Sequence, residues 1–120
     1  YHSAIALNIK LQTHTMLGFL KKLFSGGDNT ELQNAINENG AFLVDVRTPG
    51  EFKSGSVQGA VNIPLNTLQS NLNKFKTKKT VVVFCASGMR SSQAKSILTR
   101  NGISNVYNGG PWHKVQRLKN

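Results

Sequence analysis

The sequence predicts a single α/β domain with a central, mainly parallel sheet flanked by helices. Short apolar runs alternate with segments of helical spacing, which is the pattern of strand–helix–strand units. The run TVVVFC at residues 80–85 has no polar alternation, which indicates a strand covered on both faces, as in parallel sheets. A length of 120 residues and an apolar share of 38% suit one domain with one core.

The predicted elements follow one another at short intervals after the SGGDN break at residues 25–29. Apolar runs bounded by turn residues predict strands over residues 41–46, 59–64, 80–85 and 103–108. Apolar positions at helical spacing predict helices within residues 30–40, 65–75 and 91–102, and a last helix from Pro111. Turns are expected at Pro49-Gly50 and at Gly109-Gly110.

Residues 1–27 are expected to be an N-terminal lead, and residues 28–120 the domain itself. Within the lead, AIALNIKL at residues 4–11 fits an edge strand or a disordered segment, and Met16 is a candidate natural start. The stretch MLGFLKKLF at residues 16–24 fits a short amphipathic helix rather than a signal peptide. No apolar stretch reaches the length of a membrane span. We therefore expect a cytoplasmic protein without a membrane span.

The formal net charge of +10 invites a nucleic-acid interpretation, but the basic residues are spread along the chain. The densest cluster, within residues 74–79, lacks interleaved aromatic residues and fits a solvated loop, so no nucleic-acid partner is expected. A positive field would still attract small anions to a cleft. The single cysteine cannot form an internal disulfide, and three scattered histidines give no zinc spacing. We expect no metal and no cofactor.

The stretch CASGMRSS, residues 85–92, places that cysteine at the carboxyl end of the most apolar strand, where α/β sheets form their ligand clefts. A helix predicted to begin near Ser91 directs unpaired N–H groups toward the loop, and Arg90 adds a positive charge. Small loop residues allow the backbone to curl around a sulfur atom or an anion, in an open site. We therefore expect the pKa of Cys85 to lie below its ordinary value.

Five segments together resemble the rhodanese family of single-domain sulfurtransferases, from about Thr30 to the C-terminus. They are DVR and EF at residues 45–52, GAVNIP at 59–64, the cysteine loop, and the Gly109-Gly110 turn, in the order of that family. The resemblance implies that a Cys85 thiolate takes the outer sulfur of thiosulfate or a related anionic donor. The resulting persulfide would pass that sulfur to cyanide or to a thiol acceptor.

The residues and the resemblance together assign roles in this reaction. Cys85 is the expected catalytic nucleophile. The expected substrate-binding residues lie in or face the cysteine loop, and are Arg90, Ala86, Ser87, Gly88, Met89, Ser91 and Arg47. The expected supporting residues are Asp45, Glu51, Gly109 and Gly110.

Several of these residues have a second interpretation. Arg47 could form a surface ion pair with Glu51 instead of binding an anion. Asp45 could bond to Arg47, to the cysteine loop or to its own turn, and Trp112 could line the cleft or pack in the core. Ser56 stands where the family often has a histidine, so a weaker local hydrogen-bond network is expected.

Loop length favours sulfur chemistry over phosphate chemistry. The spacing from Cys85 to Arg90 is C-x4-R, whereas phosphatases that resemble rhodaneses in fold carry a loop one residue longer. Two further functions stay open. One is a persulfide carrier or interaction module with little thiosulfate turnover, and the other is a non-catalytic basic binding domain.

Overall fold

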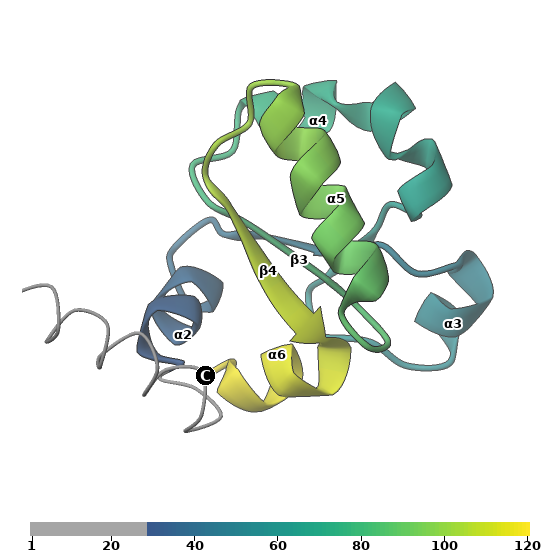
Figure 1. Cartoon of the computed structure of the whole chain (residues 1–120). Coiled ribbons are helices and arrows are strands. Elements are labelled where there is room, and N and C mark those ends of the chain that lie inside the picture. Colours follow the sequence, from purple (N-terminus) through teal and green to yellow (C-terminus); the bar gives the residue numbers. More distant parts are fainter. Residues whose placement is uncertain (1–28) are drawn as a thin grey trace, which may run out of the picture.

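A four-stranded parallel sheet forms the centre of the computed structural model, which describes residues 29–120 (Figure 1). The strands lie in the order β2-β1-β3-β4 and every neighbouring pair is parallel. Their bounds are Phe42–Asp45 for β1, Val61–Asn62 for β2, Val81–Cys85 for β3 and Val106–Pro111 for β4. The predicted parallel α/β architecture is therefore confirmed.

Helices cover both faces of the sheet. Their bounds are Thr30–Ile36 for α2, Pro49–Lys53 for α3, Leu65–Asn71 for the 3₁₀-helix η1, Asn73–Lys76 for α4, Met89–Arg100 for α5 and Trp112–Leu118 for α6. Helices α4 and α5 lie on one face, and α2 and α6 lie side by side on the other (Figure 1). Over residues 29–120, none of these helices has the length and apolar character needed to cross a membrane.

Strand β3 lies inside the sheet, and all five of its residues are buried. Alternate side chains enter two separate cores, because successive residues of a strand point to opposite faces. Val83 and Cys85 join the core under α5 and η1, whereas Val82 and Phe84 join the core under α2 and α6. The prediction that this strand is covered on both faces is confirmed.

Two predicted turns are regular structure instead. Pro49-Gly50 begins helix α3, because Thr48 accepts a hydrogen bond from the Glu51 amide while the Glu51 carboxylate accepts one from the Thr48 amide. Gly109 and Gly110 lie within β4, where the pairing with β3 skips Gly109 and forms a bulge.

Two helix predictions differ in their bounds. The helix expected over residues 65–75 is divided into η1 and α4. Helix α5 begins at Met89 instead of near Ser91, so Ser91 lies buried in its first turn. The predictions for residues 4–11 and 16–24 concern segments outside the described residues.

We expect Gly109→Ala to destabilise the fold. A Cβ atom at this position would lie 2.5 Å from Val115 Cγ2 and 3.2 Å from Val82 Cγ1, both in the packed interior. Overpacking of this kind costs roughly 1–3 kcal/mol of unfolding free energy, measurable by denaturant titration. Gly50→Ala is the matched control, because nothing lies within 4 Å of a Cβ there. Equal unfolding free energies for the two variants would contradict the proposed close approach.

Candidate functional site

Cys85 is the last residue of β3 and leads directly into the loop that begins α5. Gly88 makes the reversal possible, because its φ of +107° is strained for any residue with a side chain. A Cβ atom on Gly88 would lie 3.5 Å from the Cα of Gly110. The cysteine loop therefore passes close to the end of β4, in the region where Gly109 and Gly110 were expected to support it.

Backbone N–H groups of this loop point inward at the cysteine sulfur. The amide of Gly88 donates to Cys85 Sγ at 2.9 Å, and the amide of Ser91 donates to it at 3.4 Å. The thiol lies 3.5 Å from the Ser91 hydroxyl oxygen and donates to it. The sulfur is thus surrounded by groups that can stabilise negative charge on it.

These contacts determine the pKa of the thiol. Burial of Cys85 raises its pKa, but its hydrogen bonds with the Ser91 hydroxyl and with the amides of Ser91, Gly88 and Ser87 together lower it by more. The net pKa therefore lies below the ordinary value for a cysteine. The inward N–H groups expected from the sequence contribute to this direction. The Arg90 charge also interacts favourably with the Cys85 thiolate, which contributes to the raised pKa of Arg90.

The sulfur is not open to solvent, contrary to the expectation of an open loop. Cys85 has a relative exposure of 0%. The loop amides close directly on the sulfur, whereas Ala86, Ser87 and Met89 of the same loop are exposed. A donor molecule can therefore reach the sulfur only after a local movement of the residues around it.

Arg90 is paired with Glu51 across the mouth of the loop. Its two terminal nitrogens donate to the two Glu51 carboxylate oxygens at 2.7 and 2.9 Å. The guanidinium, together with the Thr48 hydrogen bonds, holds the pKa of Glu51 at about 2. The pairing joins α3 to α5 and leaves the Arg90 charge partly neutralised, so Arg90 is less available to an anion than expected.

Arg47 lies buried and is paired with Asp45, so the alternative of a surface ion pair with Glu51 is wrong. Its guanidinium binds the carboxylate of Asp45 at 2.7–3.0 Å and the carbonyl of Gly55 at 2.6 Å. Asp45, itself fully buried, also accepts a hydrogen bond of 2.6 Å from Ser56. Because these partners occupy the guanidinium, the structure gives Arg47 a structural place rather than a substrate-binding one.

Ser56, at the position that the resemblance singled out, donates a hydrogen bond to Asp45. Trp112 lies beneath the Arg47 guanidinium, 5.1 Å from it, and packs against the core under α2 and α6. Of its two interpretations, core packing therefore fits the structure.

Asn108 contacts the site, although the sequence analysis assigned it no chemical role. Its Oδ1 atom accepts a hydrogen bond of 2.7 Å from the Ser91 hydroxyl and one of 2.9 Å from the Gly110 amide. The only signal in the sequence was its position directly before the two glycines of β4. The contact depends on the β4 bulge, which the sequence did not predict.

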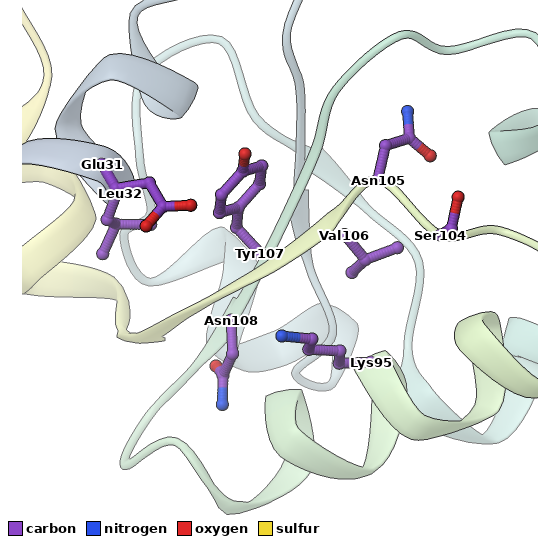
Figure 2. Close-up of a pocket in the computed structure, with 8 residues that line it drawn as sticks. All are labelled: Glu31, Leu32, Lys95, Ser104, Asn105, Val106, Tyr107 and Asn108. Carbon is purple, nitrogen blue, oxygen red and sulfur yellow. The ribbon is translucent and has the colours of Figure 1, made fainter. Parts of the chain in front are cut away.

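A groove of about 490 Å³ runs along β4, on the edge of the sheet. It is lined by Glu31, Leu32, Lys95, Ser104, Asn105, Val106, Tyr107 and Asn108 (Figure 2). Cys85 is not among the lining residues, and of the lining residues on β4 Asn108 lies nearest along the strand to the cysteine loop. The groove is therefore distinct from the cysteine loop, but it is joined to that loop through Asn108.

The chain matches a known protein family over most of its length. The family described as "Rhodanese-like domain" matches residues 28–110. The uncharacterized protein YqhL of Bacillus subtilis is 43% identical over 68 residues, which cover 57% of this chain and 54% of that protein. Thiosulfate sulfurtransferase PspE of Escherichia coli is 41% identical over 69 residues, which cover 56% of this chain and 66% of that protein. The chain thus spans between half and two thirds of the length of these two relatives.

Solved structures show the same fold. The structure described as "rhodanese with anions from E. coli" has a TM-score of 0.57 at 37% identity, and the match covers 62% of this chain and 89% of that one. The human single-domain sulfurtransferase TSTD1 has a TM-score of 0.59 at 28% identity, with 71% and 88% covered.

The Glu51–Arg90 pair should give the fold a distinct pH dependence. Because the pKa of Glu51 falls from 4.5 to about 2 on folding, its contribution to stability is fully present above pH 4.5. That contribution is lost as the pH falls through 4.5 toward 2. We therefore expect the difference in unfolding free energy between wild type and Glu51→Gln to shrink over this range.

Denaturant titrations at a series of pH values would measure this difference. Repeating the comparison in an Arg90→Gln background should give a much smaller pH-dependent difference, because the partner of the carboxylate is gone. A difference that stays constant from neutral to acid pH would show that the ion pair does not form in solution.

Proposed function

Since the chain belongs to the rhodanese-like domain family, we propose that it is a sulfurtransferase that carries a sulfane sulfur on Cys85. The donor is thiosulfate or a related anion, and the acceptor is cyanide or a thiol. The observation that carries this proposal is the pair of backbone N–H groups, from Gly88 and Ser91, aimed at the cysteine sulfur. A persulfide, like a thiolate, is an anion that such donors stabilise.

The chemistry consists of two nucleophilic displacements. The Cys85 thiolate attacks the outer sulfur of thiosulfate, a new S–S bond forms, and the old S–S bond breaks with its electron pair leaving on sulfite. Cyanide or a thiolate then attacks the terminal sulfur of the persulfide. The cysteine leaves as a thiolate, so the site is regenerated and each step is easier than a single direct transfer.

A hydrogen-bonded thiolate supports both steps. Its lowered pKa raises the fraction of nucleophile at neutral pH and makes the same sulfur a better leaving group in the second displacement. The amides of a short C-x4-R loop contact the sulfur directly. This compact geometry favours transfer of one sulfur atom over enclosure of a phosphate.

Donor binding requires two local changes. The residues around Cys85 have to move, because Cys85 has no exposed surface. An anionic donor also competes with Glu51 for the Arg90 guanidinium. The net charge of +10 offsets part of this competition by raising the local concentration of anions.

The thiocyanate assay, with thiosulfate and cyanide as substrates, tests the proposal. We expect turnover in the wild-type protein and none above background in Cys85→Ala, because no other residue of the chain is a cysteine. Ser92→Ala is the matched control, since Ser92 is the exposed neighbour of the loop in α5 and should retain full turnover. Turnover that survives Cys85→Ala would refute the proposed nucleophile.

The buried sulfur and the paired Arg90 favour a second candidate function within the same chemistry. A persulfide carrier would accept sulfur slowly, protect it under the closed loop, and release it to a protein thiol that opens the loop. Mass spectrometry distinguishes the two. A persulfide that persists in the presence of cyanide but is discharged by a protein thiol identifies a carrier.

A further inference from the structure

We propose that Asn108 is a positioning residue that directs the Ser91 hydroxyl hydrogen away from the Cys85 sulfur. In this way it sets the balance between thiol and thiolate from outside the cysteine loop. The inference rests on the proposed function, because it concerns the same sulfur. It assigns Asn108 no contact with the substrate or with the sulfur itself.

The direction of each hydrogen bond follows from the Gly110 amide. An amide N–H can only donate, so the Asn108 atom 2.9 Å from Gly110 N is the carbonyl oxygen Oδ1. The same oxygen lies 2.7 Å from Ser91 Oγ. A carbonyl oxygen can only accept, and therefore the Ser91 hydroxyl has to donate its hydrogen in this contact.

Ser91 has one hydroxyl hydrogen and three neighbours that compete for it. Asn108 Oδ1 at 2.7 Å and the Gly88 carbonyl at 3.0 Å are acceptors, and the Cys85 sulfur lies at 3.5 Å. When either oxygen holds the hydrogen, a lone pair of Ser91 Oγ faces the sulfur and accepts the thiol S–H. This arrangement matches the protonated thiol.

When Cys85 ionises, its sulfur needs a hydrogen-bond donor from Ser91 instead of an acceptor. Once the thiol proton has passed to solvent, the sulfur can no longer donate and needs donors instead. The Ser91 hydroxyl can serve it only by breaking its contact with Asn108, which is shorter than its contact with Gly88. Asn108 therefore stabilises the thiol relative to the thiolate, and the loop amides oppose it.

Asn108 reaches the site from β4 and not from the cysteine loop. Its side chain lies on the same side of β4 as Lys95 of α5, whereas Tyr107 lies on the opposite side (Figure 2). The β4 bulge brings Gly110 beside the loop and so lets one Asn108 oxygen serve both Gly110 and Ser91. A residue of a neighbouring strand thus tunes the nucleophile.

The test is a pH titration of thiolate ultraviolet absorbance, with Cys85→Ala as the spectral blank. This readout needs neither turnover nor access to the buried sulfur, so it fails or succeeds independently of the thiocyanate assay. Without the competing acceptor, Asn108→Ala should lower the midpoint by about half a pH unit, the scale of part of one hydrogen bond. In a Ser91→Ala background the same change should have no effect, because the hydroxyl through which Asn108 acts is absent.

Asn105→Ala is the matched control, since Asn105 lines the same groove but bonds to the backbone of Lys78. It should leave the midpoint unchanged. An Asn108→Ala midpoint that is unchanged or raised would overturn the proposal, and so would an equal shift in both backgrounds.

Should Asn108→Ala fail to fold, Asn108→Asp provides a second measurement. Its carboxylate holds the Ser91 hydrogen more strongly, so the midpoint should rise, and should rise further with Ser91 present than with Ser91→Ala. Equal rises in the two backgrounds would reduce the effect to simple charge repulsion and overturn the proposed role of Ser91.

Discussion

The structure depends on one physical constraint, the convergence of peptide N–H groups on a buried sulfur atom. The amides of Gly88 and Ser91 both donate to Cys85 Sγ, and they can do so only because the chain reverses immediately after β3. Burial by itself would keep this thiol neutral and unreactive. The hydrogen bonds outweigh the effect of burial and lower the pKa of Cys85. A core residue of a parallel sheet thus becomes a candidate nucleophile.

The surrounding network holds this loop from two directions. The Arg90–Glu51 pair joins it to α3, and Asn108 joins it to β4. Buried Asp45, with its own arginine, fixes the end of the neighbouring strand β1. Buried charges are tolerated when they are paired and hydrogen-bonded, and Asp45 satisfies both conditions. The same rigidity closes the loop over the sulfur, so tight stabilisation of the anion and ready access to it oppose each other.

The sequence predicted those features that depend on local pattern. The apolar run that ends in Cys85 required a strand covered on both faces, and small residues before a helix required a tight loop. Features that depend on pairing between distant segments could not be read in this way. The pairing of Arg90 with Glu51 is set by how α3 folds beside α5, which no spacing in the chain specifies. The bond between Arg47 and Asp45, two residues apart, was by contrast one of the interpretations that the sequence offered. The burial of the sulfur and the β4 bulge at Gly109 likewise arise only when neighbouring strands assemble.

The most direct test of the central claim is a pH titration of the backbone amide protons of Gly88 and Ser91, followed by nuclear magnetic resonance. If these groups stabilise the thiolate, both protons will shift downfield together as Cys85 ionises, with a shared midpoint below the ordinary thiol value of about 8.5. The shift should be absent in Cys85→Ala. Amide protons that do not respond, or a midpoint at or above the ordinary value, would contradict the account.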